Sequence, residues 1–272
     1  MNNKVNFLSD IVAAKKKEVE LKRQAAGIDD FMKTIESARP VCSFEQALSL
    51  NAPPRIIAEI KRRSPSRGIL INEPDIIKIA KDFASAGASA LSVLTDEQYF
   101  GGSLSDMTAV KEAVDIPVLR KDFIIDEFQV YESRAAGADT VLLIVKLLGE
   151  QINEYLKLSR KLGMEPLVEV HNENELKTAV DAGSKIIGIN SRNLETFSVN
   201  TSIVEQLVQH IPENIYTIAE SGIVSTDIIS ELLKLGVDGF LIGETFMRAE
   251  SPSRKLKEFI DKFRISSFIE RR

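Results

Sequence analysis

Eight short apolar runs alternate with longer stretches of helical periodicity from residue 55 onward, and this alternation constrains the fold more than any other feature. The runs are rich in β-branched residues and leucine, and the gaps between them leave room for one helix each. Repeated βα units of this kind predict a parallel sheet. The eight runs are 55–60, 90–94, 116–120, 140–145, 166–170, 185–190, 215–219 and 239–242.

Glycines stand just before four of these runs, at Gly87, Gly137, Gly183 and Gly236. A glycine suits the left-handed residue that ends a helix before the chain turns into the next strand. Eight consecutive units without a long linker favour an α/β fold that closes into a (β/α)8, or TIM, barrel. A doubly wound sheet is the alternative, but its Gly-x-Gly-x-x-Gly signature and the Gly-x-x-x-x-Gly-Lys loop are both missing.

The first fifty residues precede the first strand and read as two or three extra N-terminal helices. We expect one TIM-barrel domain over 1–272, with 1–50 as a helical extension and 51–272 as the barrel. The extension is expected to pack outside the barrel or across one end, and covering the active-site face is the sharper alternative. The first helix has a lysine-rich face, Lys15 to Lys17, expected to be solvated, and apolar positions Leu8, Ile11, Val12, Val19 and Leu21.

The charge balance excludes some classes of partner. With 35 basic and 40 acidic residues the net charge is −5, so neither a nucleic-acid-binding face nor an anionic membrane anchor has electrostatic support. The longest apolar stretch, 141–145, is far shorter than the roughly 20 residues of a membrane span, and the first thirty residues lack a secretory apolar core. We expect a cytoplasmic protein, and a monomer is the simplest expectation for it.

Cysteine and histidine are too scarce for most metal chemistry. One cysteine, Cys42, excludes an internal disulfide and a thiolate cluster, and we expect it to be a buried filler. The two histidines, His171 and His210, are expected to be surface or capping residues, and they leave little material for a zinc site. No metal site is therefore expected.

Charged side chains follow several of the apolar runs. In a barrel enzyme the chemistry lies at the carboxyl ends of the strands, so these residues are expected to converge. Crowded lysines and carboxylates shift one another's pKa, which proton-transfer chemistry uses, whereas a structural ion-pair network is the alternative for any one of them. The strand-end residues are Glu59, Lys61, Lys121, Glu169, Asn190, Arg192 and Glu220.

Small residues follow the last two strands, as Ser221-Gly222 and Gly243-Glu244. Glycine lets the backbone approach a ligand, and these two loops form the common phosphate site of such barrels, although ordinary tight turns would look alike. Class I aldolase chemistry is an open alternative, with Lys61, Lys121 or Lys146 as the Schiff-base amine.

Seven blocks in the same order resemble the indole-3-glycerol phosphate synthase family, and the resemblance runs from about Leu8 to the C-terminus. It implies ring closure of 1-(2-carboxyphenylamino)-1-deoxyribulose 5-phosphate to indole-3-glycerol phosphate in tryptophan biosynthesis, with loss of carbon dioxide and water and no cofactor. The enzyme would be a carboxy-lyase. The blocks are 58–66, 91–96 with 99–103, 119–124, 163–170, 187–194, 219–223 and 241–244.

The resemblance also implies roles for the strand-end residues. Lys121 would be the general acid for closure, and Lys61 would hold the substrate carboxylate and share in acid catalysis. Glu169 would stabilise the developing iminium charge and assist proton removal in dehydration. The residues that orient these groups or line the same mouth would be Glu59, Asn190 and Glu220.

The substrate's apolar ring and its phosphate would occupy separate parts of the site. By resemblance the phosphate cradle comprises Ser221, Gly222, Gly243 and the Glu244 backbone. The Glu244 carboxylate is tolerable beside a phosphate only if its side chain turns outward, so this orientation is expected. The extension around Leu8 to Leu21 would lie over the active-site face. The remaining substrate-binding positions would be Ser64, Phe100, Phe123, Leu142, Arg192 and Leu194.

Two further functions compete with this one. A phosphoribosyl-anthranilate isomerase would need a Cys/Asp acid–base pair, which Cys42 is badly placed to supply because it precedes the first strand. A ligand-binding barrel without catalysis is the third hypothesis, and the presence of Lys61, Lys121 and Glu169 argues against it.

Overall fold

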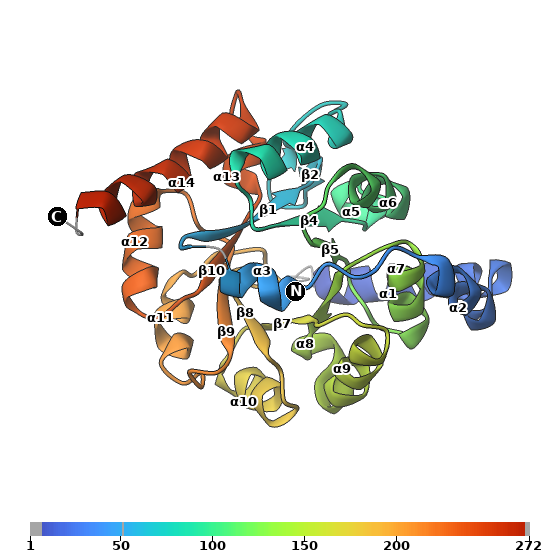
Figure 1. The fold of residues 1–272 in the computed structure, drawn as a ribbon. Coiled ribbons are helices and arrows are strands. Elements are labelled where there is room, and N and C mark those ends of the chain that lie inside the picture. The colour runs from blue at the N-terminus through green and yellow to red at the C-terminus, as the bar shows by residue number, and fades with distance from the viewer. Residues whose placement is uncertain (1–6, 51, 270–272) are drawn as a thin grey trace, which may run out of the picture.

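A closed barrel of eight parallel strands forms the centre of the molecule (Figure 1). The computed structural model describes residues 7–50 and 52–269. Neighbouring strands follow one another in chain order, and the last pairs with the first, so the barrel is confirmed and the doubly wound sheet is wrong. The strands are β1 (Arg55–Ile60), β4 (Ala90–Leu94), β5 (Val118–Lys121), β6 (Thr140–Ile144), β7 (Leu167–Val170), β8 (Ile186–Asn190), β9 (Tyr216–Glu220) and β10 (Gly239–Ile242).

Strands β1, β4 and β10 match the predicted runs at both ends, and the other five strands differ from them by one or two residues at one or both ends. Val145 begins helix α8 rather than ending β6, and Lys121 and Glu220 are the last residues of β5 and β9. A short antiparallel hairpin, β2 (Arg63–Ser64) with β3 (Gly68–Ile69), was not expected and follows β1 at the carboxyl end of the barrel. The two-residue strands carry no hydrophobic period, so the sequence gives no signal for them.

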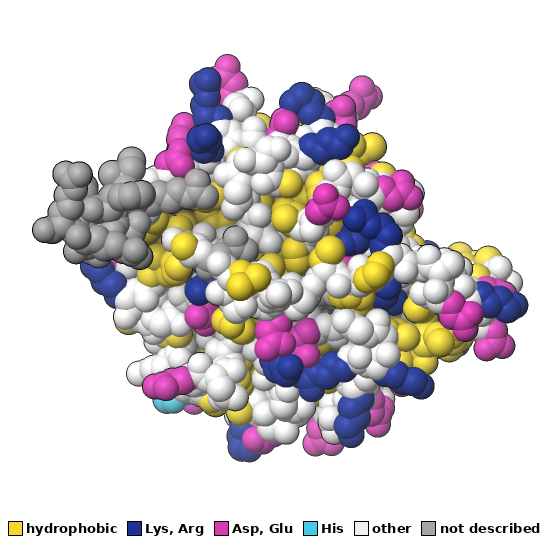
Figure 2. Space-filling model, viewed as in Figure 1, with side chains coloured by type: hydrophobic (Ala, Val, Ile, Leu, Met, Phe, Trp, Pro, Cys, Tyr) yellow, Lys and Arg dark blue, Asp and Glu magenta, His cyan; other side chains and the backbone are white. Residues whose placement is uncertain are grey.

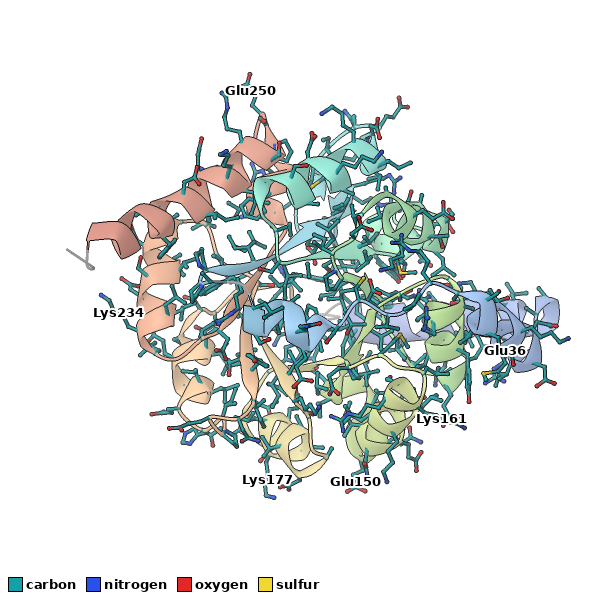
Figure 3. The ribbon with its side chains drawn as sticks, viewed as in Figure 1. Glu36, Glu150, Lys161, Lys177, Lys234 and Glu250 are labelled. Atoms are coloured by element: carbon teal, nitrogen blue, oxygen red, sulfur yellow. The ribbon has the colours of Figure 1, made fainter. Side chains whose placement is uncertain are left out.

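Helices form a ring outside the strands, and their charged outer faces point to solvent, as Glu150, Lys177 and Lys234 illustrate (Figure 3). The ring follows from the βα alternation, because the longer helices bury an apolar face on the sheet. The short elements α5 and η1 contain no buried residue. The ring helices are α4 (Ile76–Ala86), α5 (Glu97–Phe100), α6 (Leu104–Ala113), α7 (Glu127–Ala135), α8 (Val145–Leu148), η1 (Gly149–Gln151), α9 (Ile152–Lys161), α10 (Glu173–Asp181), α11 (Ser202–Val208), α12 (Thr226–Lys234), α13 (Glu244–Met247) and α14 (Pro252–Ile269).

The glycines predicted to end helices have left-handed backbones. Gly87, Gly137, Gly183 and Gly236 have φ angles of 102°, 92°, 78° and 96°. A residue with a Cβ rarely adopts this conformation, so a glycine at the helix end lets the chain reverse into the next strand. This part of the sequence interpretation is confirmed.

Three helices precede the barrel: α1 (Phe7–Ala25), α2 (Ile28–Ser37) and α3 (Phe44–Leu50). Helix α3 lies across the amino-terminal end of the barrel, where Glu45 contacts Lys185 just before β8, and it crosses the centre of Figure 1. Helix α1 instead reaches the carboxyl end, where the Phe7 and Phe197 ring centroids lie 5.1 Å apart. The expected boundary between the extension and the barrel, at residue 51, lies outside the described residues.

The expectation that Lys15 to Lys17 form a solvated face is wrong for Lys15. Lys16 and Lys17 are exposed, but Lys15 is only 1% exposed. Its ammonium lies 2.9 Å from Asp122 and 3.2 Å from Asp96, at the ends of β5 and β4. Burial lowers the pKa of Lys15, but Asp122, Asp96 and Glu18, which lies 2.7 Å away on the same helix, outweigh it and the net shift is upward. The ion pairs join α1 to the barrel mouth.

Two other expectations about single residues are wrong. Leu21, assigned to the apolar face of α1, is 66% exposed. Cys42 is half-buried rather than a filler of the core, and its sulfur lies 3.3 Å from the Lys111 ammonium, which also pairs with Asp139. Asp139 precedes β6, so Cys42 lies at the amino-terminal end of the barrel.

On the face shown in Figure 2, lysines and arginines are mixed with acidic residues instead of forming a basic field. Over the described part of the chain, no helix is both long enough and apolar enough to cross a membrane.

Candidate active site

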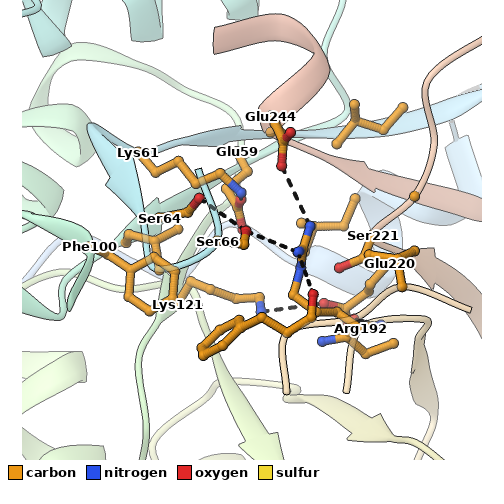
Figure 4. A pocket seen from close by; sticks show the side chains of 18 of the residues that line it. Glu59, Lys61, Ser64, Ser66, Phe100, Lys121, Arg192, Glu220, Ser221 and Glu244 are labelled. Atoms are coloured by element: carbon orange, nitrogen blue, oxygen red, sulfur yellow. Dashed lines mark hydrogen bonds and ion pairs between the residues drawn. The ribbon is translucent and has the colours of Figure 1, made fainter. Parts of the chain in front are cut away.

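A cavity of about 710 Å³ opens at the carboxyl ends of the strands. Strand alternation points the last polar residues of successive strands to the barrel interior, so residues far apart in sequence meet here (Figure 4). The structure brings together every site residue predicted from the sequence. The predicted residues in its lining are Glu59, Lys61, Ser64, Phe100, Lys121, Phe123, Leu142, Glu169, Asn190, Arg192, Leu194, Glu220, Ser221, Gly222, Gly243 and Glu244.

Lys121 ends β5 and lies between two carboxylates. Its ammonium is 3.3 Å from Glu169 Oε2 at the end of β7 and 3.4 Å from Glu220 Oε2 at the end of β9. Burial lowers the pKa of Lys121, but Glu169, Glu220 and Glu59 outweigh burial and raise it. Lys121 is therefore a charged proton donor held at the centre of the mouth.

The pKa values of the two carboxyl groups beside Lys121 are shifted in opposite directions. Burial raises the pKa of Glu220, and the neighbouring Glu169 and Glu59 carboxylates raise it further. Burial also acts on Glu169, but Lys121 and His171 outweigh it and lower its pKa. A Cβ on Gly188 of β8 would lie 2.1 Å from Glu220 Oε1, so glycine leaves the space that this carboxyl group occupies.

A second ion pair lies on β1 and just beyond it. Lys61 Nζ contacts Glu59 Oε1 at 2.5 Å, and both side chains are largely buried. Burial raises the pKa of Glu59, but Lys61 and Lys121 outweigh it and lower it. A Cβ on Gly243 would lie 2.4 Å from Glu59 Oε1, so glycine at this position makes room for the pair.

Arg192 connects three loops around the mouth. Its guanidinium donates to Ser66 Oγ at 3.2 Å and to the Phe197 carbonyl at 3.1 Å, and it lies 3.5 Å from Glu244 (Figure 4). Asn190 holds the base of this loop, because its Oδ1 accepts a hydrogen bond from Arg192 N at 3.0 Å. The ends of β1, β8 and β10 are thereby joined through one cation.

The side chain of Glu244 does not turn away from the cavity as expected. Its carboxylate lies 3.1 Å from Arg67, 3.5 Å from Arg192 and 3.7 Å from Arg248. The three guanidiniums offset its charge, so it is tolerated beside an anion-binding loop. Arg67 and Arg248 were missed by the sequence interpretation, although Arg67 directly follows the motif that ends at Ser66.

Apolar side chains form one wall of the cavity. The Phe100 and Phe123 rings are tilted by 36° with centroids 6.2 Å apart, and Leu142 and Leu194 line the same cavity. Phe197 was missed, and its positive φ of 55° and its loop position give no sequence signal. The wall offers space for a flat aromatic group beside the charged centre.

The opposite part of the lining is a turn of small residues. Ser221 and Gly222, just after β9, both have positive φ, 62° and 75°. A non-glycine residue in this conformation is strained, and such strain is concentrated at ligand-binding and catalytic sites. A Cβ on Gly222 would lie 2.8 Å from Thr201 and 2.9 Å from Val199, so glycine is required here by space as well.

One histidine was placed wrongly by the sequence interpretation. His171 is not a simple surface residue: its side chain is 12% exposed, and Nε2 lies 3.3 Å from Glu169 Oε1. Its Nδ1 lies 3.0 Å from Glu175 Oε2. A histidine two residues after Glu169 lies on the same strand face, which is the signal that could have identified it. His210 is exposed, as expected.

Metal and Schiff-base chemistry find less support than acid–base chemistry. Among the described residues, no group of three or more His, Cys, Asp or Glu side chains could hold a metal ion. Lys146 is outside the cavity lining and pairs with Glu195 at 2.7 Å. Lys121 keeps its proton, because its pKa is raised, whereas a Schiff-base amine must be neutral.

Comparison with solved structures bears on the fold. The solved thiamine phosphate pyrophosphorylase of Pyrococcus furiosus has a TM-score of 0.57 at 16% identity, covering 77% of this chain and 96% of that one, which supports the barrel fold alone.

Two curated relatives match over nearly their full length, and both are named indole-3-glycerol phosphate synthase. One, from Thermoanaerobacter pseudethanolicus, is 42% identical over 253 residues, which is 93% of this chain and 96% of the relative. The other, from Aquifex aeolicus, is 43% identical over 259 residues, which is 94% of this chain and 99% of the relative. The family model of indole-3-glycerol phosphate synthase matches residues 8–259. The chain therefore belongs to the indole-3-glycerol phosphate synthase family.

Proposed function

We propose that this chain is a carboxy-lyase that converts 1-(2-carboxyphenylamino)-1-deoxyribulose 5-phosphate to indole-3-glycerol phosphate in tryptophan biosynthesis. The observation that carries the proposal is Lys121, a largely buried cation between two carboxylates and beside an apolar wall. The reaction needs a proton donor at a ketone, an apolar wall against which the anthranilate ring can lie, and a base. All three features line one cavity.

Ring closure begins with attack of the aromatic carbon on the substrate ketone. The carbonyl oxygen gains negative charge as the carbon–carbon bond forms, and Lys121 donates its proton to that oxygen. Phe100, Phe123, Leu142 and Leu194 form the apolar wall against which the ring lies, so that the reacting carbons are brought into register.

Decarboxylation follows because closure leaves the ring as an iminium ion. The bond from the ring to the carboxylate breaks, and its electron pair restores the aromatic ring while carbon dioxide departs. Lys61 holds the departing carboxylate, and Glu59 orients Lys61 through their 2.5 Å contact. The anionic Glu169 stabilises the positive charge of the iminium ion.

Dehydration completes the indole. The hydroxyl group made during closure leaves as water after protonation by a lysine, and Glu169 takes the proton that the adjacent carbon loses. Glu169 is suited to this step because its lowered pKa keeps it ionised at neutral pH. Asn190 and Arg192 stiffen the neighbouring loop and keep the substrate against this base.

The phosphate group is assigned to the loops after β9 and β10. Ser221 and Gly222 bring backbone N–H groups to one side, Gly243 and the Glu244 backbone provide the other, and Ser64 faces the same cavity. Arg67, Arg192 and Arg248 supply positive charge that a phosphate dianion needs in a chain of net charge −5. We also propose a cytoplasmic monomer that contains a single TIM-barrel domain.

The substrate assay tests the proposal directly. The chain has no tryptophan and four tyrosines, so indole emission from the product should be visible above a weak protein background. We expect emission to grow catalytically when the substrate is added without metal or cofactor. Tight binding of the product by folded protein that produces no indole emission would instead favour a ligand-binding barrel.

The Glu244→Gln variant tests the assignment of the phosphate. Glu244 contacts three arginines that the phosphate would use, so the carboxylate competes with the ligand for them. We expect the glutamine variant to bind inorganic phosphate more tightly, by roughly threefold to tenfold, because it removes a like charge of about 1 kcal/mol at this half-exposed position. Isothermal titration calorimetry measures this. Unchanged or weaker phosphate binding, with Glu250→Gln as the matched surface control, would contradict the assignment.

A further inference from the structure

The contacts of Lys121 do not by themselves decide which of its two flanking carboxyl groups is ionised. Glu169 Oε2 and Glu220 Oε2 lie 3.3 and 3.4 Å from its ammonium, and both side chains are 1% exposed. Their charges repel, so two buried carboxyl groups this close to one lysine favour a state in which one of them is protonated. Something other than Lys121 must decide which group that is.

A second cation reaches Glu169. His171 Nε2 lies 3.3 Å from Glu169 Oε1, whereas Lys121 pairs with the other oxygen, Oε2. Among the described residues, Glu220 pairs with Lys121 and with no further cation, whereas Glu169 pairs with both Lys121 and His171. The environments of the two carboxylates therefore differ by the His171 imidazole and by the Asn190 side chain, which also lowers the pKa of Glu169.

Glu175, on α10, keeps that imidazole charged. Its Oε2 lies 3.0 Å from His171 Nδ1 and accepts a hydrogen bond from His171 N at 2.8 Å. Burial lowers the pKa of His171, but the hydrogen bonds and charges of Glu169 and Glu175 raise it to about 9. At neutral pH the ring is an imidazolium with a carboxylate on each side.

We infer that His171 selects the catalytic base: it keeps Glu169 ionised and leaves Glu220 as the carboxyl group that holds a proton. His171 is a positioning residue, because it does not line the cavity and acts through Glu169. The inference rests on the proposed role of Glu169 in dehydration. The other charged groups that face the pair are Glu59 from β1, Lys121 from β5 and Glu220 from β9.

The selection matters most after closure. Lys121 gives up its proton in that step, so the cation beside Glu169 Oε2 becomes a neutral amine. His171 is then the remaining cation at Glu169, and it keeps the carboxylate from taking a proton before dehydration requires it. Without His171, Glu169 and Glu220 would share a proton more equally, and the base would be lost first at acid pH.

The pH dependence of turnover in His171→Gln tests the inference. Glutamine keeps a polar side chain beside Glu169 and Glu175 but removes the charge. The pKa of Glu169 should rise, so kcat should match the wild type closely near pH 8 and fall on the acid side by about tenfold for each pH unit below the new pKa. The matched control is His210→Gln, which removes the exposed histidine and should leave the profile unchanged.

A second measurement does not depend on activity. The chain has two histidines, so NMR titration of their ring protons gives His171 and His210 separately. Because coupling between two titrating sites is reciprocal, Glu169→Gln should lower the pKa of His171 from about 9, and should leave His210 unmoved. Glu175→Gln should lower it as well and should shift the activity profile in the same direction as His171→Gln.

The outcomes separate the inference from the proposed function. A parallel loss of kcat at every pH in His171→Gln, or a His171 pKa that ignores Glu169→Gln, would overturn the inference. Wild-type protein that produces no indole would overturn the function, while the NMR coupling would still decide whether His171 charges Glu169. If His171→Gln does not fold, the NMR titration of Glu169→Gln decides alone.

Discussion

Replacing Lys121 by methionine is expected to lower kcat by about 10²- to 10⁴-fold, the contribution of a positioned general acid. Methionine keeps most of the side-chain volume but cannot donate a proton to the ketone oxygen. The fold should persist, because Glu169 retains His171, Glu59 retains Lys61, and Glu220 is held protonated by its raised pKa. Indole emission measures the rate, and circular dichroism checks the fold.

A control lysine separates this effect from a general loss of charge. Lys146 lies outside the cavity lining and pairs with Glu195, so Lys146→Met should leave the rate within about twofold, as surface changes generally do. Full activity in Lys121→Met would refute the assignment of the acid. Full activity there together with inactivity in Lys146→Met would instead revive a Schiff-base mechanism at Lys146.

Replacing Lys15 by methionine is expected to lower the free energy of unfolding by about 3 kcal/mol, near the low end for breaking a buried ion pair. The variant leaves the Asp96 and Asp122 carboxylates buried without this cation. The cost stays near the low end because Asp122 retains Arg120 at 3.0 Å, and Asp96 retains the Tyr99 N–H at 2.8 Å. Urea unfolding at neutral pH measures the change.

Two neighbours on the same helix are the matched controls for Lys15. Lys16→Met and Lys17→Met remove the same charge from exposed positions and should change stability by less than about 0.5 kcal/mol. Equal stability in all three variants would show that the buried pairs contribute nothing net.

KM should also rise in Lys15→Met, because Asp122 and Asp96 hold the backbone N–H groups of Phe123 and Tyr99, beside the apolar wall.

The barrel could be predicted from the sequence because its signals are local. Each strand is an apolar run, each helix shows its own period, and glycines such as Gly87 and Gly236 mark the turns between them. The parallel arrangement then sends all strand ends to one side, so Lys121, Glu169 and Glu220 could be expected to meet. The family resemblance added the reaction, which no periodicity contains.

The errors fall where a side chain's environment comes from distant segments. Lys15 was predicted to be solvated because the sequence of its own helix does not reveal its contacts with Asp96 and Asp122, which lie at the ends of two strands. Glu244 was expected to face outward because the sequence does not reveal that Arg67, Arg192 and Arg248 surround it. Burial and pairing of charges depend on contacts between segments far apart in the chain.

The sequence by itself determined the order of strands and helices, the barrel, and which residue types stand at the carboxyl end. The tertiary structure alone decided how those charges are divided: Lys121 shared by two carboxylates, and His171 added to one of them. The physical reason is that secondary structure follows from the local pattern of apolar residues, whereas a buried group's charge follows from desolvation and from neighbours within a few ångströms.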